Sequence, residues 1–199
     1  MKTERLFVSC ELGDAESYRL AFEQAFGHLF SALASRPAYL DSRSADAYSE
    51  DLHRLGLIDA ATCIVVLVSR NAHSSRRIDW EIASGLQRDE SGVAAALLGI
   101  MLPEVPRRMA PQGAAPGVPF FDYKEMPPRL ADNVRSGYAR IYDWTWICAD
   151  EVRVGEALAA AAVARRERTH LLDNSRQRLT KDLPAVIAYT AQRERRRRI

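Results

Sequence analysis

Cys63-Ile64-Val65-Val66-Leu67-Val68 is apolar at every position, and this run decides the fold class. A strand with one face in water alternates apolar and polar residues, whereas a strand covered on both faces does not. Parallel sheets are covered in this way because their connecting helices lie on both sides. We therefore predict that residues 63–68 form a central parallel strand.

Short apolar and β-branched runs recur on either side of this strand, and helical periodicity fills the stretches between them. The predicted strands are residues 5–10, 37–40, 63–68, 94–102 and 138–144. The predicted helices are residues 16–34, 48–60, 75–87 and 150–168. This alternation predicts an α/β fold with a doubly wound five-stranded parallel sheet and helices on both faces. Five prolines between residues 103 and 119 predict a long surface loop.

The length and composition fit a single cytoplasmic domain. A chain of 199 residues with 47% hydrophobic and 27% charged residues can bury a core and stay in solution. The charged N-terminus lacks the apolar core of a secretory signal, and the longest Ala-rich stretch is too short to cross a membrane. Cys10, Cys63 and Cys148 have no ligand spacing, so we expect three reduced thiols and no metal site.

The basic charge of the chain is concentrated at its C-terminal end. Residues 165–199 hold 11 Lys and Arg against 4 Asp and Glu, a net charge of +7. We expect residues 1–168 to form the domain and residues 169–199 to be a basic C-terminal extension with a helix near 184–193. The arginines could bind nucleic acid by charge alone. Because no aromatic residues are interleaved with them, we predict a solvated end and no nucleic-acid partner.

Polar residues follow the first three predicted strands, where ligands bind in sheets of this kind. Glu81 falls within the first two turns of the helix that comes after the third strand. A carboxylate there can point at the ligand crevice. The alternative, favoured by spacing alone, is that Glu81 only complements the helix dipole or pairs with a nearby Arg. His73 could be a base in the preceding loop, although a solvated loop histidine is the commoner case.

Several common catalytic and nucleotide-binding motifs do not occur in the sequence. It contains no Gly-x-Gly-x-x-Gly and no Gly-x-x-x-x-Gly-Lys, which excludes the usual dinucleotide and P-loop signatures. It also lacks the Gly-x-Ser-x-Gly elbow of α/β hydrolases. Motif spacing therefore leaves the function open.

The order of several segments resembles bacterial TIR-like domains, and most closely the TIR-like proteins of Thoeris anti-phage defence. The resemblance covers about residues 5 to 168. It rests on Phe7-Val8-Ser9, on residues 59–69, on Ser75-Arg76-Arg77-Ile78-Asp79-Trp80-Glu81-Ile82, on Leu97-Leu98-Gly99-Ile100 and on Ile141-Tyr142-Asp143-Trp144.

The resemblance implies a flavodoxin-like fold and an activity that cleaves the nicotinamide glycosidic bond of NAD+. It implies a cyclic ADP-ribose signal that activates a separate effector, with NAD+ as substrate and no cofactor. Glu81 matches the catalytic glutamate of the family. The residues expected to contact the nucleotide are Ser9, Cys10, Arg43, Ser69, Asn71, Arg77 and Trp80.

Two positions depart from the family pattern and favour a second hypothesis. Arg77 stands where many TIR enzymes have Trp, and Cys10 stands where they often have an aromatic residue. Stacking on the bases would then come from other residues such as Trp80. The second hypothesis is a non-catalytic TIR module that signals by assembly, including homo-oligomers. A third is a different glycosidase or nucleotide-binding protein of the same fold.

Overall fold

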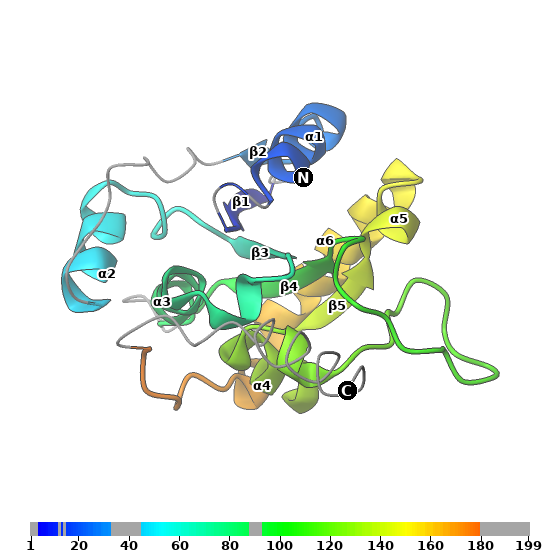
Figure 1. Cartoon of the computed structure of the whole chain (residues 1–199). Coiled ribbons are helices and arrows are strands. Elements are labelled where there is room, and N and C mark those ends of the chain that lie inside the picture. The colour runs from blue at the N-terminus through cyan, green and yellow to red at the C-terminus, as the bar shows by residue number, and fades with distance from the viewer. Residues whose placement is uncertain (1–3, 12, 14, 33–44, 88–92, 180–199) are drawn as a thin grey trace, which may run out of the picture.

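The strands of the computed structural model form one five-stranded sheet (Figure 1). The structure describes residues 4–11, 13, 15–32, 45–87 and 93–179. The strands are β1 Arg5–Ser9, β2 Ser31–Ala32, β3 Cys63–Val68, β4 Ala96–Met101 and β5 Arg140–Asp143. They lie in the order β2-β1-β3-β4-β5, with every neighbouring pair parallel. This is the flavodoxin-like order of doubly wound sheets, so the predicted fold class is confirmed.

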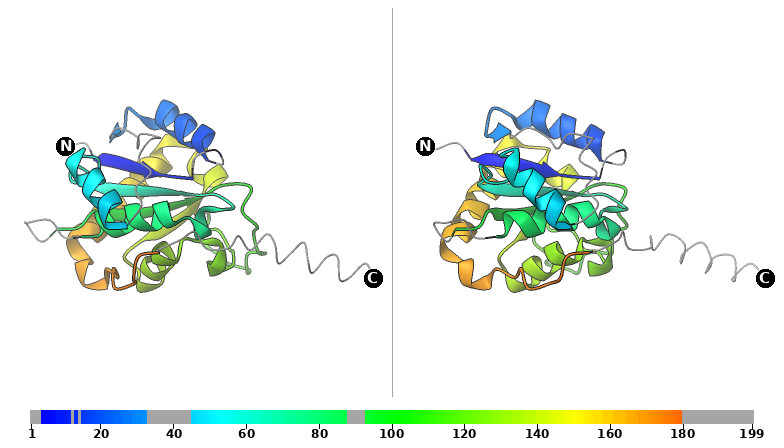
Figure 2. Two further views of the ribbon diagram at one scale, coloured as in Figure 1. Left: turned by 60° about the vertical axis from the view of Figure 1, so that its left-hand side comes forward. Right: turned by 90° about the vertical axis from the view of Figure 1, so that its left-hand side faces the viewer.

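Helices cover both faces of this sheet (Figure 2). The α-helices are α1 Glu16–Phe26, α2 Ala45–Arg54, α3 Arg76–Gly85, α4 Pro128–Ser136, α5 Trp144–Ile147 and α6 Glu151–Glu167. Three short 3-10 helices are η1 Ala72–Ser74, η2 Tyr123–Glu125 and η3 Thr169–Leu171. One layer contains α2, α3 and α4, and the other contains α1, α5 and α6 (Figure 1). No helix in the described ranges is both long and apolar enough to cross a membrane.

The side chains of β3 alternate between the two helical layers, as the pleat of a strand requires. Ile64, Val66 and Val68 belong to the core cluster under α2, α3 and α4. Val65 and Leu67 belong to the cluster under α1 and α6. All six residues of the strand are buried, which explains why the sequence shows no polar alternation.

The first helix and the second strand differ from the predictions. Helix α1 ends at Phe26, eight residues before the predicted end. Phe30 lies beyond the helix but stacks on Phe22, with ring centroids 5.6 Å apart. Because Phe30 is buried on the same side as the apolar face of α1, its position in the sequence fits the helical period although it is not helical. The strand that pairs with β1 is Ser31–Ala32. The predicted strand at 37–40 lies outside the described residues.

Helix α4 was missed by the sequence analysis because two polar side chains, Arg129 and Asn133, occupy its buried face. They break the apolar periodicity on which the prediction relied. The terminal signals were present: Pro128 is the first helical residue, and Gly137 follows the last with φ +85°. The packed chain also continues past the boundary predicted at residue 168, since residues 173–179 hydrogen-bond to α3 and α4.

Candidate functional site

Glu81 is the sixth residue of α3, the helix that leaves the carboxyl end of β3 by way of η1. The helix begins at Arg76 because the Ser75 hydroxyl accepts a hydrogen bond from the backbone N–H of Ile78, as an N-cap does. The Glu81 side chain is only 1% exposed. It is therefore a buried carboxylate rather than a helix-end charge in solvent.

Two hydroxyl groups hold this carboxylate. The Ser9 hydroxyl donates to Glu81 Oε2 at 2.5 Å, and the Tyr48 hydroxyl donates to Oε1 at 2.6 Å. Ser9 is the last residue of β1, and β1 pairs with β3. Glu81 consequently lies beside the carboxyl end of β1, at the point between β1 and β3 where the strand order reverses. Doubly wound proteins bind their ligands at this switch point.

The three residues meet because of strand parity and helix packing. Ser9 is on the same side of β1 as Phe7, which belongs to the cluster under α2 and α3. Tyr48 comes from α2, and α2 is joined to α3 by the 2.7 Å hydrogen bond between the hydroxyls of Ser49 and Ser84. The end of α3 lies close on the sheet, since a Cβ at Gly85 would come within 2.0 Å of Ile64 Cδ1.

Cys10 and Trp80 lie beside Ser9 and Glu81 in the sequence but point elsewhere. Cys10 is buried in the cluster on the opposite face of the sheet. Trp80 is buried in the α2 and α3 layer, where its ring lies 5.4 Å from that of Tyr48. The Trp80 Nε1 donates to the backbone carbonyl of Leu179 at 2.6 Å. In this structure Trp80 packs behind Tyr48.

The other predicted contact residues lie after β3. Ser69 is fully buried just beyond the strand, and Asn71 is half-buried immediately before η1. Arg77, the second residue of α3, is half-buried. Arg43 lies outside the described residues. The structure thus brings Ser9 into contact with Glu81 and places Ser69 and Asn71 at the same edge of the sheet.

This edge also holds buried polar atoms that have no hydrogen-bond partner among the described residues. They include Ser69 Oγ and His73 Nε2, and the equally buried Glu104 carboxylate interacts with the Tyr18 hydroxyl. Ser69 and His73 follow β3, and Glu104 follows β4, the adjacent strand. His73 Nδ1 is paired with the Arg70 carbonyl at 3.0 Å. Buried polar groups are rarely left unpaired, so water or a polar ligand is expected here.

Tyr18 and Trp144 lie near Glu104. Burial raises the pKa of the Tyr18 hydroxyl, and the nearby Glu104 carboxylate raises it further. The Tyr18 ring meets Trp144 edge to face, with centroids 5.0 Å apart. The backbone of Glu104 is held by Arg70, whose Nη2 donates to its carbonyl at 3.3 Å. The sequence analysis did not single out Glu104 or Tyr48, because no motif spacing links either residue to Glu81.

Arg107 fixes the loop that follows β4. It donates to the carbonyls of Met101 and Leu102 and to the Asp143 carboxylate, with an Nη2 to Oδ2 distance of 3.0 Å. Burial alone would raise the pKa of Asp143. Hydrogen bonds from Thr145 and Arg107 outweigh that effect and hold the pKa below its ordinary value. The carboxyl ends of β4 and β5 are thereby joined at the same edge of the sheet as the candidate site.

Two thiols and a cavity at the amino end of the strands add no second candidate site. Burial raises the pKa of Cys148 to about 12 and raises that of Cys63 further, which makes both thiols unreactive near neutral pH. A cavity of about 150 Å³ is bounded by Arg5, Asp59 and Arg165 at the amino end of the strands, opposite Glu81. Across the described part of the chain, no group of three or more His, Cys, Asp and Glu could hold a metal ion.

Comparison with known proteins gives one result on family membership. The family model for the TIR-like domain of the Thoeris protein ThsB matches residues 19–107. This region includes Tyr48, Glu81 and Glu104, whereas Ser9 and all residues after Arg107 lie outside it. A search of curated proteins finds no match to the chain.

Proposed function

We propose that this chain, of which residues 19–107 match the TIR-like domain of the Thoeris protein ThsB, cleaves NAD+ at the nicotinamide glycosidic bond. In this proposal the product is a cyclic ADP-ribose-type signal that activates a separate effector during anti-phage defence. Glu81 is the catalytic residue. NAD+ is a substrate, and the reaction needs no cofactor.

One observation carries the proposal: a buried carboxylate, Glu81, is held by two hydroxyls at the switch point of a doubly wound sheet. Burying a carboxylate costs free energy, and an apolar side chain of the same size would fill the space without that cost. Buried titratable side chains are concentrated at functional sites. The position also matches the catalytic glutamate implied by the sequence resemblance.

The chemistry requires a fixed negative charge beside the ribose. When the bond between C1′ and the nicotinamide nitrogen breaks, the bonding electrons leave with nicotinamide and the ribosyl group becomes an oxocarbenium-like cation. Nicotinamide departs as a neutral molecule, so no acid is needed to protonate it. A preorganised carboxylate stabilises the developing positive charge.

Ser9 and Tyr48 would keep the Glu81 carboxylate in one orientation before substrate arrives. Exchange of one of their hydrogen bonds for one from a ribose hydroxyl would bring the substrate onto the carboxylate. Attack by water at C1′ would then give ADP-ribose and release a proton. Attack by a group of the same nucleotide would give a cyclic product.

The unpaired polar atoms near β3 and β4 support a polar ligand at this edge. A nucleotide offers hydroxyl and amino groups that could pair with Ser69, His73 and Glu104. We propose Ser69 as a nucleotide contact on this ground, and Asn71 because it lies at the same edge of the sheet. Arg43, Arg77, Cys10 and Trp80 stay proposals from the sequence resemblance alone.

Replacement of Glu81 by Gln tests the proposal. Purified wild-type protein should release nicotinamide from NAD+, alone or with lysate of phage-infected cells, and Glu81→Gln should release none. Chromatography of the reaction mixture measures nicotinamide and identifies the nucleotide product. Glu23→Gln, which changes a glutamate on α1, is the matched control and should keep wild-type turnover. Undiminished release by a folded Glu81→Gln protein would refute the assignment.

The alternative function is a non-catalytic TIR interaction module. It is favoured by the position of Trp80 in the core, where its ring packs against Tyr48 and is not available to stack on a base. If neither purified protein nor protein with infected lysate releases nicotinamide, this alternative is preferred. Sedimentation of the protein with and without lysate would then measure its assembly.

A further inference from the structure

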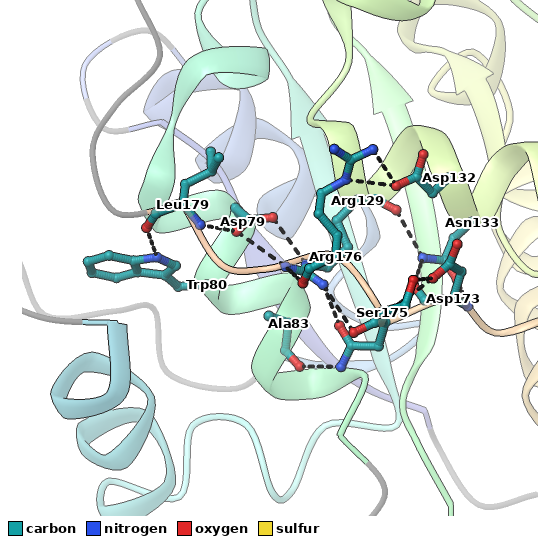
Figure 3. A network of polar contacts seen from close by, with 11 residues as sticks. Asp79, Trp80, Ala83, Arg129, Asp132, Asn133, Asp173, Ser175, Arg176 and Leu179 are labelled. Carbon is teal, nitrogen blue, oxygen red and sulfur yellow. Dashed lines mark hydrogen bonds and ion pairs between the residues drawn. The ribbon is translucent and has the colours of Figure 1, made fainter.

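Residues 173–179 run across α3 and α4, and we call this segment the strap (Figure 3). At its start, Asp173 exchanges two hydrogen bonds with the Asn133 side chain of α4, at 2.7 and 3.0 Å. At its end, Leu179 pairs with two residues of α3. The strap lies outside residues 19–107, which match the family model.

At the centre of these contacts lies a buried ion pair between α3 and α4. Arg129 Nε donates to Asp79 Oδ1 at 3.0 Å, and both side chains are 1% exposed. The other nitrogens of the guanidinium donate to the strap, at 2.7 Å to Asn174 Oδ1 and 2.9 Å to the Arg176 carbonyl. The strap thus completes the hydrogen bonding of Arg129.

The end of the strap holds the two residues that precede Glu81. The backbone N–H of Leu179 donates to Asp79 Oδ2 at 3.0 Å, and its carbonyl accepts from Trp80 Nε1 at 2.6 Å (Figure 3). Asn174 Nδ2 donates to the Ala83 carbonyl at 3.0 Å, two residues after Glu81. The strap therefore binds α3 on both sides of Glu81 in the sequence.

The strap reaches α2 as well. Arg178 pairs with Asp46 at 2.9 Å. Because Asp46 is exposed to solvent, this ion pair contributes little to stability. Helix α2 supplies Tyr48, the hydroxyl partner of Glu81 Oε1. Both helices that form the Glu81 contact are consequently in contact with residues 173–179.

Directional contacts are needed to fix the rotation of α3. The apolar face of the helix, with Ile78 and Ile82, packs on the core through non-directional burial. Burial of this kind has no preferred direction, whereas hydrogen bonds do. Together with the Ser84–Ser49 bond to α2, the hydrogen bonds of Asp79, Trp80 and Ala83 to the strap favour the rotation in which Glu81 points at Ser9 and Tyr48.

We propose that the strap holds α3 in the orientation in which Glu81 meets Ser9 and Tyr48. Asp79, Arg129 and the Leu179 backbone are positioning residues for Glu81. The part of this inference that concerns turnover rests on the proposed NAD+ cleavage, whereas the part that concerns the position of Glu81 does not.

The matched pair Leu179→Pro and Leu179→Ala tests the proposal in the full chain. Proline removes the N–H that donates to Asp79, and alanine keeps it while removing the same apolar side chain. Asn174→Ala is a second variant that removes the contacts with Arg129 and Ala83 without introducing proline. Each variant is first checked for cooperative unfolding and a wild-type circular dichroism spectrum.

Three readouts separate the parts of the proposal. Hydrogen exchange of residues 76–85 reports the hold of the strap on α3. The ¹³C resonance of the Glu81 carboxyl carbon, assigned by its loss in Glu81→Gln, reports the position of Glu81 independently of NAD+. Steady-state kinetics then separates kcat from KM.

In Leu179→Pro and Asn174→Ala we expect the backbone amides of α3 to exchange hydrogen faster and the Glu81 carboxyl resonance to shift. Leu179→Ala should resemble wild type in both measurements. Where wild type is active, kcat should fall at least about tenfold with a smaller change in KM, as for a misplaced catalytic group. An unchanged Glu81 resonance in both strap variants overturns the proposal. Faster exchange with unchanged kcat overturns the positioning role. If wild-type protein never cleaves NAD+, the proposed function is refuted. The Glu81 resonance then still tests whether the strap positions Glu81.

Discussion

Asp79 and Glu81 are two buried carboxylates on one helix, and their partners differ in kind. Asp79 pairs with the guanidinium of Arg129 and with the Leu179 N–H, whereas Glu81 accepts hydrogen bonds from the hydroxyls of Ser9 and Tyr48. Residues two apart on an α-helix point to opposite sides. One side of α3 is therefore joined to α4 and the strap, and the other side faces the switch point of the sheet.

The difference separates a structural carboxylate from a candidate catalytic one. An arginine that bonds a carboxylate through two nitrogens meets its charge and geometry together, which suits a permanent link between elements. Hydroxyl groups orient a carboxylate and can exchange with the hydroxyls of a sugar. Among the contacts described, the chemistry of the partners distinguishes the two carboxylates more clearly than their burial does.

Asp79→Ala should produce the largest loss of stability, because it leaves the Arg129 charge buried without its partner. We expect unfolding to become easier by about 3–5 kcal/mol, as for other broken buried pairs. Urea denaturation at pH 7 measures the change. The control is Asp46→Ala, which breaks the exposed pair between the strap and α2 and should change stability little. Equal losses in the two variants would contradict the structural role of Asp79.

Tyr48→Phe should have the next largest effect and should act on the Glu81 side. Removing a hydroxyl that donates to a buried carboxylate costs about 1.5–3 kcal/mol, and we expect a fall in turnover as well. Tyr138→Phe is the matched control. It removes a hydroxyl that donates to the Ala95 carbonyl at 2.7 Å in the same layer, and it should leave turnover unchanged. If both variants reduce nicotinamide release alike, Tyr48 has no special relation to Glu81.

Trp80→Phe tests whether the hydrogen bond between Trp80 and Leu179 helps to hold the strap on α3. Phenylalanine keeps an aromatic ring against Tyr48 but loses the Nε1 donor to the Leu179 carbonyl. We expect unfolding to become easier by about 1 kcal/mol from the hydrogen bond, with a further contribution from the smaller ring. Thermal and urea unfolding measure the change. A variant as stable as wild type would show that this bond does not hold the strap.

Arg107→Met should lower stability more at neutral pH than at acid pH, and it compares the half-buried Asp143 with the two buried carboxylates. In wild type the pKa of folded Asp143 lies below its ordinary value. Its contribution to stability is therefore complete above that ordinary value and is lost as the pH falls through the lowered pKa. Without Arg107 the pKa should rise, so less stability remains to be lost on acidification. Urea midpoints at pH 6 and pH 3 measure the difference.

Much of the fold was predictable because its signals are local. The apolar run at residues 63–68 identified a strand covered on both faces, and the strand begins and ends at those residues. The helix that carries Glu81 was predicted over residues 75–87 and runs from Arg76 to Gly85. The final helix was predicted over residues 150–168 and runs from Glu151 to Glu167. Periodicity and capping residues determine such elements from their own neighbourhoods.

The errors arose where tertiary contacts replaced local signals. Phe30 continues the spacing of α1 only because it folds back on Phe22. Helix α4 escaped notice because Arg129 and Asn133 are buried through pairing with residues 40 to 50 positions away. A polar residue on a predicted buried face argues against a helix unless its distant partner is known.

By itself the sequence determined the alternation of strands and helices, four of the five strands, the family resemblance and the choice of Glu81. Only the tertiary structure decided what surrounds that residue. Ser9 lies 72 positions and Tyr48 33 positions from Glu81, and Leu179 lies 100 positions from Asp79. The physical reason is that periodicity records which face of an element is buried, whereas a hydrogen bond between distant residues leaves no periodic trace in either segment.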